Sequence, residues 1–387
     1  MSSVSIGESL QLDHKLFVGR PNLGSRQAFL ERVNDILDRR WLSNDGVYVQ
    51  EFERRVAEFL GVKHCVSICN ATIALQMVTR ALDLSGEVII PSYTFVACAH
   101  ALQWQEITPV FCDIDPKTHL IDLAKVERLI TPRTTGIMGV HLWGRGCEVD
   151  ALQQIADRHK VRLFYDASHA FGCTIGGKRI GSFGEAEVFS FHATKFINSL
   201  EGGAVTTNND DLAAKLRMMR NFGFTNYDQV EYLGINGKMN EMSAAMGLTN
   251  LEAIDGIVAA NRSNYLAYQD GLRKIPGLSV INYSGEEQSN FQYIVVEVDP
   301  DKCPAFRDHI VAELHKRNVI ARKYFWPGCH RMEPYKSLYP NSHLWLQETE
   351  RVAAKVIVLP TGETVSTETV GTICKMICEI VREQTTV

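Results

Sequence analysis

Residues 190–205 read SFHATKFINSLEGGAV and contain one lysine, Lys195, between a strand-like apolar run and a Glu-Gly-Gly turn. A lysine is almost never fully buried without a partner. Lys195 is therefore either a solvated loop residue or a reactive amine. A lysine that forms a Schiff base needs surroundings that lower its pKa, so that the neutral amine attacks a carbonyl. The sequence on both sides bears on this choice.

Short β-rich runs alternate with helical patterns on both sides of Lys195. One helix is predicted between the first two runs, since Leu75, Val78 and Leu82 share a face. Another is predicted over residues 149–160. This alternation is typical of an α/β core with a mostly parallel sheet, here covering about residues 60–255. The seven runs are 65–69, 87–92, 109–114, 136–142, 161–167, 186–191 and 203–208.

The pattern changes after about residue 260, where a polar helical stretch leads into PGLSVINYS and NFQYIVVEV and then a helix near 304–317. A chain of 387 residues is long enough for a large domain and a smaller one. We predict a large α/β domain over residues 1–255, including an N-terminal helical segment, and a small C-terminal α+β domain over residues 256–387.

Composition excludes several classes of protein. Forty Lys and Arg residues against 45 Asp and Glu residues give a net charge of −5, which provides no basic field for nucleic acid or an anionic membrane. The N-terminal stretch MSSVSIGESLQLDHK lacks the layout of a secretory signal, and no apolar window is long enough for a membrane span. We expect a cytoplasmic protein. Its ten cysteines show no CxxC pair, which favours buried reduced thiols over a metal site.

Three catalytic motifs are absent or incomplete. GCTIGGKR (172–179) nearly matches a phosphate-binding Walker A loop, but Arg179 occupies the Ser/Thr position that binds magnesium. A tight Gly-Gly turn between short strands explains it better. GRGCEV (144–149) lacks the third glycine of a dinucleotide fingerprint, and there is no G-x-S-x-G elbow.

Three polar features follow predicted strands, where open α/β sheets bind ligands. NAT (70–72) precedes a helix, so its free N–H groups suit a phosphate, although Asn70 or Thr72 acting as a helix cap is an equally open account. Asp166 ends an apolar strand and is either a cap or the partner of a cation. His169 is either a core histidine or a ligand. Lys195 is the third feature.

A phosphate cradle, a carboxylate and a Schiff-base lysine are together what pyridoxal 5′-phosphate requires. The phosphate must be anchored, the ring nitrogen must stay protonated, and the aldehyde must be held covalently. Asp166 serves the ring nitrogen in this hypothesis. No metal is required.

The chain resembles the DegT-type sugar aminotransferases, which are pyridoxal-phosphate enzymes of fold type I. The resemblance is carried by motifs in order along nearly the whole chain: GVYVQEFERRVAEFLG (46–61), IPSYTFVA (90–97), DIDP (113–116), VHLWG (140–144), YDASHAFG (165–172), SFHATK (190–195), EGGAV (201–205) and GINGKMNEMSAAMG (234–247). It implies a seven-stranded, mostly parallel sheet flanked by helices, followed by a smaller α+β domain.

The resemblance also implies roles for individual residues. Lys195 corresponds to the lysine that binds the cofactor aldehyde, and Asp166 to the partner of the pyridine nitrogen. The remaining cofactor contacts are His169 near the phenolic oxygen, Phe95 stacked on the ring, Ser190 with Asn70, Ala71 and Thr72 at the phosphate, and Asn236 reaching the phosphate of a neighbouring subunit. An obligate homodimer with shared active sites follows from the last contact.

Two positions depart from the family pattern. Ala71 stands where glycine is usual, which requires a negative φ there. Lys238 stands where arginine is common after the asparagine, which keeps the charge but loses bidentate recognition of an anionic substrate group.

The activity implied is transfer of an amino group from glutamate to a nucleotide-linked keto-deoxysugar. The wording of SFHATK and GINGKMNE is most similar to the branch that aminates C4 of a dTDP-4-keto-6-deoxyhexose. Amination at C3, dehydration on the same fold and a noncatalytic ligand-sensing role are the alternatives; retention of Lys195 argues against the last two. Residues 322–330 are expected to face the substrate, Gly202 and Gly203 to allow close chain passage, and His192 to serve only packing.

Overall fold

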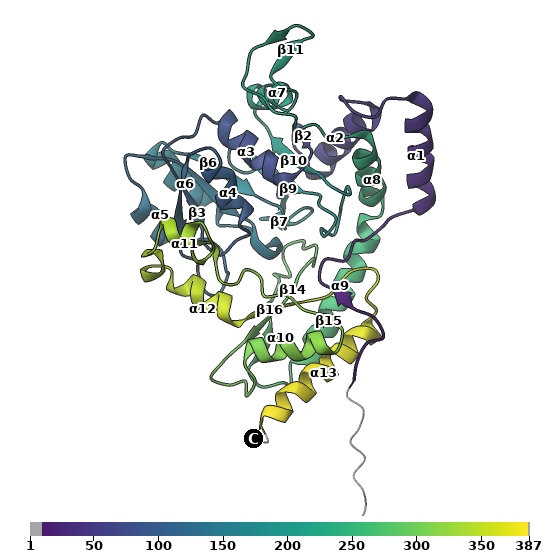
Figure 1. Ribbon diagram of the computed structural model, residues 1–387, viewed down its shortest axis with the longest axis vertical. Helices are drawn as coiled ribbons and strands as arrows, with labels where there is room; N and C mark the ends of the chain where they lie inside the picture. The colour runs from purple at the N-terminus through teal and green to yellow at the C-terminus, as the bar shows by residue number, and fades with distance from the viewer. Residues whose placement is uncertain (1–9, 386–387) are drawn as a thin grey trace, which may run out of the picture.

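The core of the protein is a seven-stranded sheet, seen in a computed structural model that describes residues 10–385. The strand order is β2-β10-β9-β6-β5-β3-β4 (Figure 1). β10 runs antiparallel to β2 and β9, and the other neighbours are parallel. All seven strands were predicted: β2 (His64–Ile68), β3 (Glu87–Pro91), β4 (Thr108–Cys112), β5 (Thr134–Val140), β6 (Arg162–Asp166), β9 (Glu187–Ser190) and β10 (Gly203–Thr207).

Alternate side chains of the central strands enter different hydrophobic clusters, as the two-residue period of a strand requires. Val188 and Val205 lie in the cluster that includes α3 (Ala71–Ala81). Phe189 and Ala204 lie in the cluster that includes α2 (Val47–Leu60) and α8 (Glu241–Glu252). Both faces are therefore covered by helices, which explains why these strands are almost wholly apolar.

Most of the remaining helices of this part lie between consecutive strands along the chain, and α1 precedes them. The predicted helix over 149–160 is α6. With α6 (Val149–His159), these helices are α1 (Arg26–Arg39), α4 (Ala97–Gln103), α5 (Leu123–Leu129) and α7 (Asp210–Met219), and a 3-10 turn lies at Leu142–Gly144.

A second part lies below the sheet in Figure 1 and contains a three-stranded antiparallel sheet, β13-β14-β16. The long helix α9 leads into it. Its elements are α9 (Ile254–Leu272), β13 (Leu278–Val280), β14 (Ile294–Val298), α10 (Arg307–Lys316), β15 (Val319–Ile320), β16 (Val356–Leu359) and α13 (Thr367–Thr385). Between β15 and β16, the helices α11 (Tyr335–Leu338) and α12 (Gln347–Lys355), with 3-10 turns at Cys329–Arg331 and Ser342–Leu344, pack in the hydrophobic cluster of the large sheet.

The start of the described chain packs with this second part. β1 (Leu16–Phe17) pairs in parallel with β15, and Leu16 is buried in the cluster formed by α9, α10 and α13. The sequence left open which domain the first 60 residues contact, and residues 16–17 pair with the C-terminal part. The division at residue 255 itself stays a prediction.

Several smaller predictions concern local features. Gly176 and Gly177, both with positive φ, form the turn of a hairpin between β7 (Thr174–Ile175) and β8 (Lys178–Arg179), which confirms the Gly-Gly turn. The ten cysteines carry free thiols, and eight of them are buried. Among residues 10–385, no helix is long and apolar enough to cross a membrane. Residues 1–9 of the N-terminal stretch discussed above lie outside the described residues.

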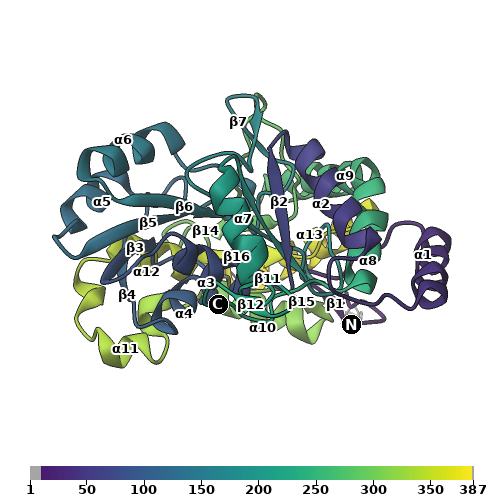
Figure 2. The same ribbon diagram turned by 90° about the horizontal axis from the view of Figure 1, so that it is seen from above.

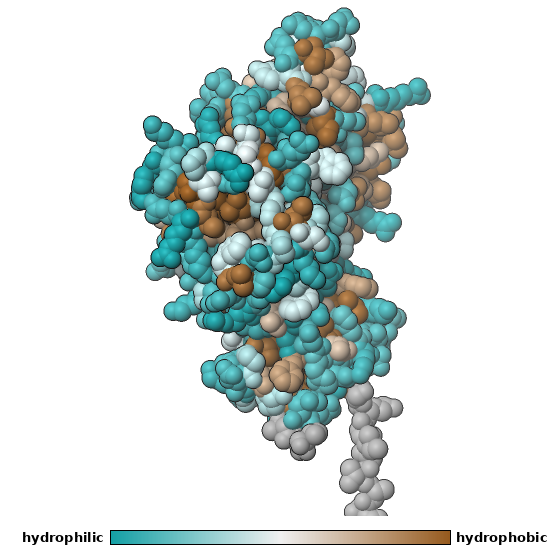
Figure 3. Space-filling model, turned by 60° about the vertical axis from the view of Figure 1, so that its left-hand side comes forward, coloured by the Kyte–Doolittle hydropathy of each residue, from teal (hydrophilic) through white to brown (hydrophobic). Residues whose placement is uncertain are grey.

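Two elements project from the body of the molecule. Helix α1 stands apart at the right of Figure 2, and the hairpin of β11 (Phe224–Asn226) and β12 (Gln229–Val230) rises at the top of Figure 1. Hydrophobic side chains are visible at the top of the surface in Figure 3. The exposed apolar residues on and around this hairpin are Phe222, Phe224, Tyr227, Val230, Leu233 and Ile235.

Candidate active site

A cavity of about 660 Å³ opens where several sheet strands end. Asp166 is the last residue of β6, Ser190 is the last of β9, and Asn70 follows β2. The cavity brings together eight of the nine predicted site residues: Asn70, Ala71, Thr72, Phe95, Asp166, His169, Ser190 and Lys195. The carboxyl ends of the parallel strands thus form the site, as expected for an open α/β sheet.

Lys195 lies half-buried in this cavity and is not a solvated loop residue. Its Nζ donates to the hydroxyl of Tyr293, 3.3 Å away. Burial lowers the pKa of the Lys195 ammonium to about 8, against an opposing effect from the negative charge of Asp166. A much larger fraction of the Lys195 amine is therefore neutral near pH 7 than for a lysine in water. The neutral form is the one that attacks a carbonyl.

Asp166 is buried and held by two donors. The backbone N–H of Ser168 donates to its Oδ1 at 2.9 Å, and the thiol of Cys98 donates to its Oδ2 at 3.0 Å. The contact with Ser168 closes a local turn, and no helix begins there, so Asp166 is not a helix cap. The carboxylate still lines the cavity, and its oxygens can accept a further hydrogen bond from a group bound there.

His169 is buried beside Lys195, and its pKa is lowered well below the ordinary range by burial and then by the charge of Lys195. The backbone N–H of Trp143 donates to its Nδ1 at 3.4 Å. A neutral ring with Nδ1 as acceptor carries its proton on Nε2. His169 is therefore a neutral group that lines the cavity with a fixed tautomer.

The start of helix α3 supplies the expected anion site. Asn70 is the N-cap and its Oδ1 accepts from the N–H of Ile73 at 2.9 Å, so the capping interpretation is confirmed. Ala71 is the first helical residue and has negative φ, as its replacement of glycine requires. The first N–H groups of a helix have no partner within it and favour a phosphate. The capping and phosphate-binding roles are thus compatible.

Gly203 explains how this helix start comes close to the sheet. A Cβ at Gly203 would lie 2.6 Å from the backbone nitrogen of Ala71, and one at Gly202 would overlap the Ser199 hydroxyl. The prediction that the Gly-Gly pair allows close chain passage is confirmed.

Three further residues complete the wall around Lys195. Phe95 exposes 56% of its surface and lines the cavity, so its ring face is available for stacking. Ser190 is half-buried, and its Oγ accepts from the N–H of His192 at 3.4 Å. His192 contacts Thr194 Oγ1 at 2.8 Å and Glu201 at 3.3 Å, with 45% of its side chain exposed. The expectation that His192 serves only packing was wrong, because it lines the cavity.

Asn236 lies outside this cavity. It is exposed and pairs with Asn221 next to the β11–β12 hairpin. Lys238 donates to Asn221 Oδ1 at 3.0 Å and lies 4.7 Å from the centre of the Phe222 ring. Neither residue contributes to the cavity of its own chain.

The opposite wall comes from the second part of the chain, and sequence reasoning missed one of its residues, Tyr293. Tyr293, Arg322, Tyr324 and Phe325 line the cavity from the second part of the chain. The 322–330 segment was predicted to face the substrate, and three of its residues do line the cavity. Tyr293 was seen only as part of a strand-like run, and no local pattern connects it with Lys195, which is 98 residues away.

The residues present fit pyridoxal phosphate. A helix start suited to a phosphate, a buried carboxylate, an exposed aromatic face and a lysine of lowered pKa share one cavity. No group of three or more His, Cys, Asp or Glu side chains within the described part of the chain is arranged to hold a metal ion.

Comparison with known proteins identifies the family of this chain. Residues 25–378 match the DegT/DnrJ/EryC1/StrS aminotransferase family. The dTDP-4-amino-4,6-dideoxy-D-glucose transaminase of Shigella dysenteriae is 35% identical over 95% of this chain and all of its own. The GDP-perosamine synthase of Caulobacter vibrioides is 34% identical over 84% of this chain and 88% of its own.

Solved structures give the same result. DesI, crystallised in the presence of its TDP-sugar product, superposes with a TM-score of 0.93 at 45% identity, covering 98% of this chain and 96% of its own. Helicobacter pylori PseC, an aminotransferase involved in the biosynthesis of pseudoaminic acid, gives a TM-score of 0.89 at 28% identity, covering 95% of this chain and 100% of its own.

Proposed function

We propose a specific reaction for this chain, which belongs to the DegT/DnrJ/EryC1/StrS aminotransferase family and is a pyridoxal-phosphate-dependent sugar aminotransferase. The amino donor is glutamate, and the acceptor is a dTDP-4-keto-6-deoxyhexose that is aminated at C4. The observation that carries the chemistry is the Lys195 amine, with its pKa lowered to about 8, in one cavity with Asp166. The substrate class is supported by the similarity to DesI and to the Shigella transaminase.

Bound pyridoxal phosphate supplies an electron sink and a carbonyl that exchanges amines. Asp166, buried at the end of β6, would hold a proton on the ring nitrogen. The N-terminal N–H groups of α3 and the Ser190 hydroxyl hold the phosphate. Phe95 would stack on the ring of the cofactor, and His169 would contact it near its phenolic oxygen.

Lys195 has two tasks in this proposal. Its amine would bind the cofactor covalently, and once free it would act as the base and acid that moves the proton of the donor α-carbon. Its lowered pKa lets the free amine accept that proton near neutral pH. Tyr293, whose hydroxyl is 3.3 Å from Nζ, restricts where the amine points when it is free.

The net exchange balances without another reagent. The α-amino group of glutamate replaces the carbonyl oxygen of the sugar, and glutamate becomes 2-oxoglutarate. Tyr324 and Phe325 form an aromatic wall of the cavity that holds Lys195, and Arg322 adds a positive charge there.

We also propose that two copies of the chain share their active sites. Asn236 is exposed and lies next to a projecting hairpin whose apolar side chains, including Phe224 and Val230, are uncovered. An exposed apolar group of this kind is typical of an interface. Mixing Lys195→Ala chains with Asn236→Ala chains tests this, because a mixed dimer contains one intact site. Recovery of activity on mixing is expected; two inactive variants that stay inactive together would refute the sharing.

The decisive experiment for the chemistry is a visible absorbance spectrum of the purified holoenzyme. The band of the lysine-linked cofactor should disappear when glutamate is added and return with 2-oxoglutarate. Lys195→Arg keeps a positive charge at this position but cannot form the linkage, so it serves as the matched control. A wild-type protein without this band, or an unchanged band in Lys195→Arg, would refute the mechanism.

The acceptor is tested separately with a panel of nucleotide-linked ketosugars. C4 amination of a dTDP-4-keto-6-deoxyhexose is the expected product, identified by mass and NMR. A preference for a 3-keto sugar, or loss of a hydroxyl without amination, would replace the proposed substrate with one of the two alternatives of C3 amination and dehydration.

A further inference from the structure

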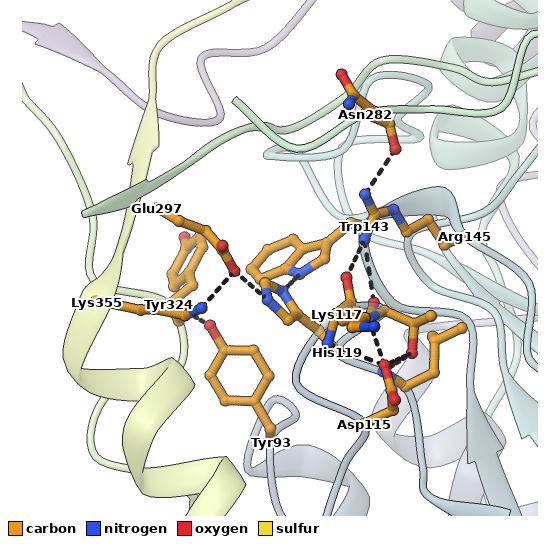
Figure 4. A network of polar contacts seen from close by, with 12 residues as sticks. Tyr93, Asp115, Lys117, His119, Trp143, Arg145, Asn282, Glu297, Tyr324 and Lys355 are labelled. Carbon is orange, nitrogen blue, oxygen red and sulfur yellow. Dashed lines mark hydrogen bonds and ion pairs between the residues drawn. The ribbon is translucent and has the colours of Figure 1, made fainter. Parts of the chain in front are cut away.

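His119 lies behind the wall of the site, at a contact between the first and second parts of the chain (Figure 4). It ends a turn in which Asp115 Oδ1 accepts from the N–H groups of Lys117 at 2.9 Å and Thr118 at 2.7 Å. Its φ is +65°, and its side chain is fully buried. A non-glycine residue in this conformation is uncommon, and here it directs the His119 side chain into the interior.

Both ring nitrogens of His119 have a partner. The indole Nε1 of Trp143 lies 3.2 Å from Nδ1, and Glu297 Oε1 lies 2.6 Å from Nε2. An indole N–H can only donate, so Nδ1 must be the acceptor and Nε2 carries the proton that is donated to Glu297. Only the neutral ring in this tautomer satisfies both contacts.

Trp143 connects this pair to the cofactor site. It is fully buried, and its backbone N–H donates to Nδ1 of His169. Its ring lies 5.8 Å from the ring of His169 at 27°, and 5.5 Å from Phe325 at 12°. With φ at +63°, Trp143 also adopts a sparsely populated backbone conformation. Its ring and backbone therefore fix the position and tautomer of His169 together.

We propose that His119 is a positioning residue for the cofactor, acting on His169 through the indole of Trp143. The inference rests on the proposed function, because it takes His169 as a cofactor contact. His119 itself touches neither the cavity nor Lys195.

A purely structural role is the competing explanation. Glu297 lies on β14 and also pairs with Lys355 at 3.1 Å, so His119 joins the two parts of the chain. Under that explanation only the Glu297 contact matters. The two contacts use different nitrogens, and two amides can separate them.

His119→Asn places an amide oxygen near the position of Nδ1, so it keeps the acceptor for Trp143 and loses Glu297. Asparagine also tolerates positive φ well. His119→Gln places an amide N–H near the position of Nε2, so it keeps the donor to Glu297 and loses the acceptor for Trp143. Trp143→Phe keeps an aromatic ring and removes only the indole donor.

The measurement is the equilibrium affinity for pyridoxal phosphate, from titration of the apoprotein. We expect the dissociation constant to rise about tenfold in His119→Gln and in Trp143→Phe, as for loss of one buried hydrogen bond, and to change much less in His119→Asn. In the double variant His119→Gln/Trp143→Phe, the two losses of affinity should not add, because both substitutions remove the same hydrogen bond.

Tryptophan fluorescence gives a second readout that needs neither cofactor nor substrate. The chain has five tryptophans, and Trp143 is the buried one, whereas the others are 46% to 82% exposed. Quenching by acrylamide should therefore leave a protected fraction in wild type and in His119→Asn. That fraction should decrease in His119→Gln.

The outcomes separate the possibilities. A larger affinity loss in His119→Asn than in His119→Gln would overturn the proposal in favour of the structural role. Equal losses in the two variants, or additive losses in the His119→Gln/Trp143→Phe double variant, would overturn it as well. A protected tryptophan and an unchanged cofactor affinity in His119→Gln would also overturn it. If the sugar substrate proved wrong, these readouts would be unaffected, because none of them includes the sugar.

Discussion

Replacement of Cys98 tests how Asp166 is held at the cofactor. Cys98 lies on α4, is fully buried, and its thiol donates to Asp166 Oδ2 at 3.0 Å. Burial raises the pKa of this thiol well above its ordinary value, so Cys98 remains a donor at every working pH. Cys98→Val keeps a similar volume and removes the donor, whereas Cys98→Ser keeps a donor.

The expected loss follows from the charge of the acceptor. Hydrogen bonds to charged groups contribute about 1.5 to 3 kcal/mol, and a thiol is a weak donor, so about 1.5 kcal/mol is appropriate. This corresponds to roughly a tenfold weaker binding of pyridoxal phosphate to apo Cys98→Val. Cys98→Ser should stay much closer to wild type.

The assay compares pyridoxal phosphate with its 1-deaza analogue, which lacks the ring nitrogen. The Cys98→Val effect should be present with pyridoxal phosphate and nearly absent with the analogue, because the Asp166 carboxylate acts on that nitrogen. Cys112→Val is the matched control, since Cys112 is equally buried and its thiol is 3.8 Å from a backbone oxygen. An equal loss with both ligands would refute the reasoning, because it would show general damage to the cavity.

Three other outcomes are expected. Because burial lowers the pKa of Lys195 to about 8, the rate at which apoprotein binds pyridoxal phosphate covalently should rise with pH and level off above about 8; a midpoint near the ordinary lysine value would contradict this. Gly203→Ala should weaken cofactor binding, because its Cβ would displace the start of α3, while Gly256→Ala, which meets nothing within 4 Å, should not. Arg220→Ala should lower the free energy of unfolding by about 3 kcal/mol, the low end for breaking a buried ion pair, since Glu53 then keeps only one cation, Arg217 at 3.8 Å; Arg54→Ala, at an exposed pair, should change it by less than about 1 kcal/mol, as measured by denaturant titration.

The sequence predicted the sheet because its information is local. Seven apolar runs separated by helical patterns predict a mostly parallel sheet, in which only β10 runs antiparallel to its neighbours, and the ends of the strands place Asp166, Ser190 and Lys195 at one edge. The Gly-Gly turn at 176–177 and the cap at Asn70 are equally local, since each depends on a backbone conformation or a hydrogen bond within a few residues.

The errors arose where contacts span long distances along the chain. His192 was expected only to pack. It instead lines a cavity whose far wall comes from residues beyond 290, and it lies beside Glu201. The pairing of Leu16 with Val319 was also missed, because a two-residue strand has no periodicity to detect.

The sequence alone thus determined the α/β sheet, the positions of the site residues on it and the family to which they correspond. Only the tertiary structure decided the environment of those residues: the lowered pKa of Lys195, the Cys98 thiol on Asp166, and the path from His119 through Trp143 to His169. The physical reason is that strand and turn preferences act between neighbours in the chain. Burial and hydrogen bonding instead depend on which distant segments pack together.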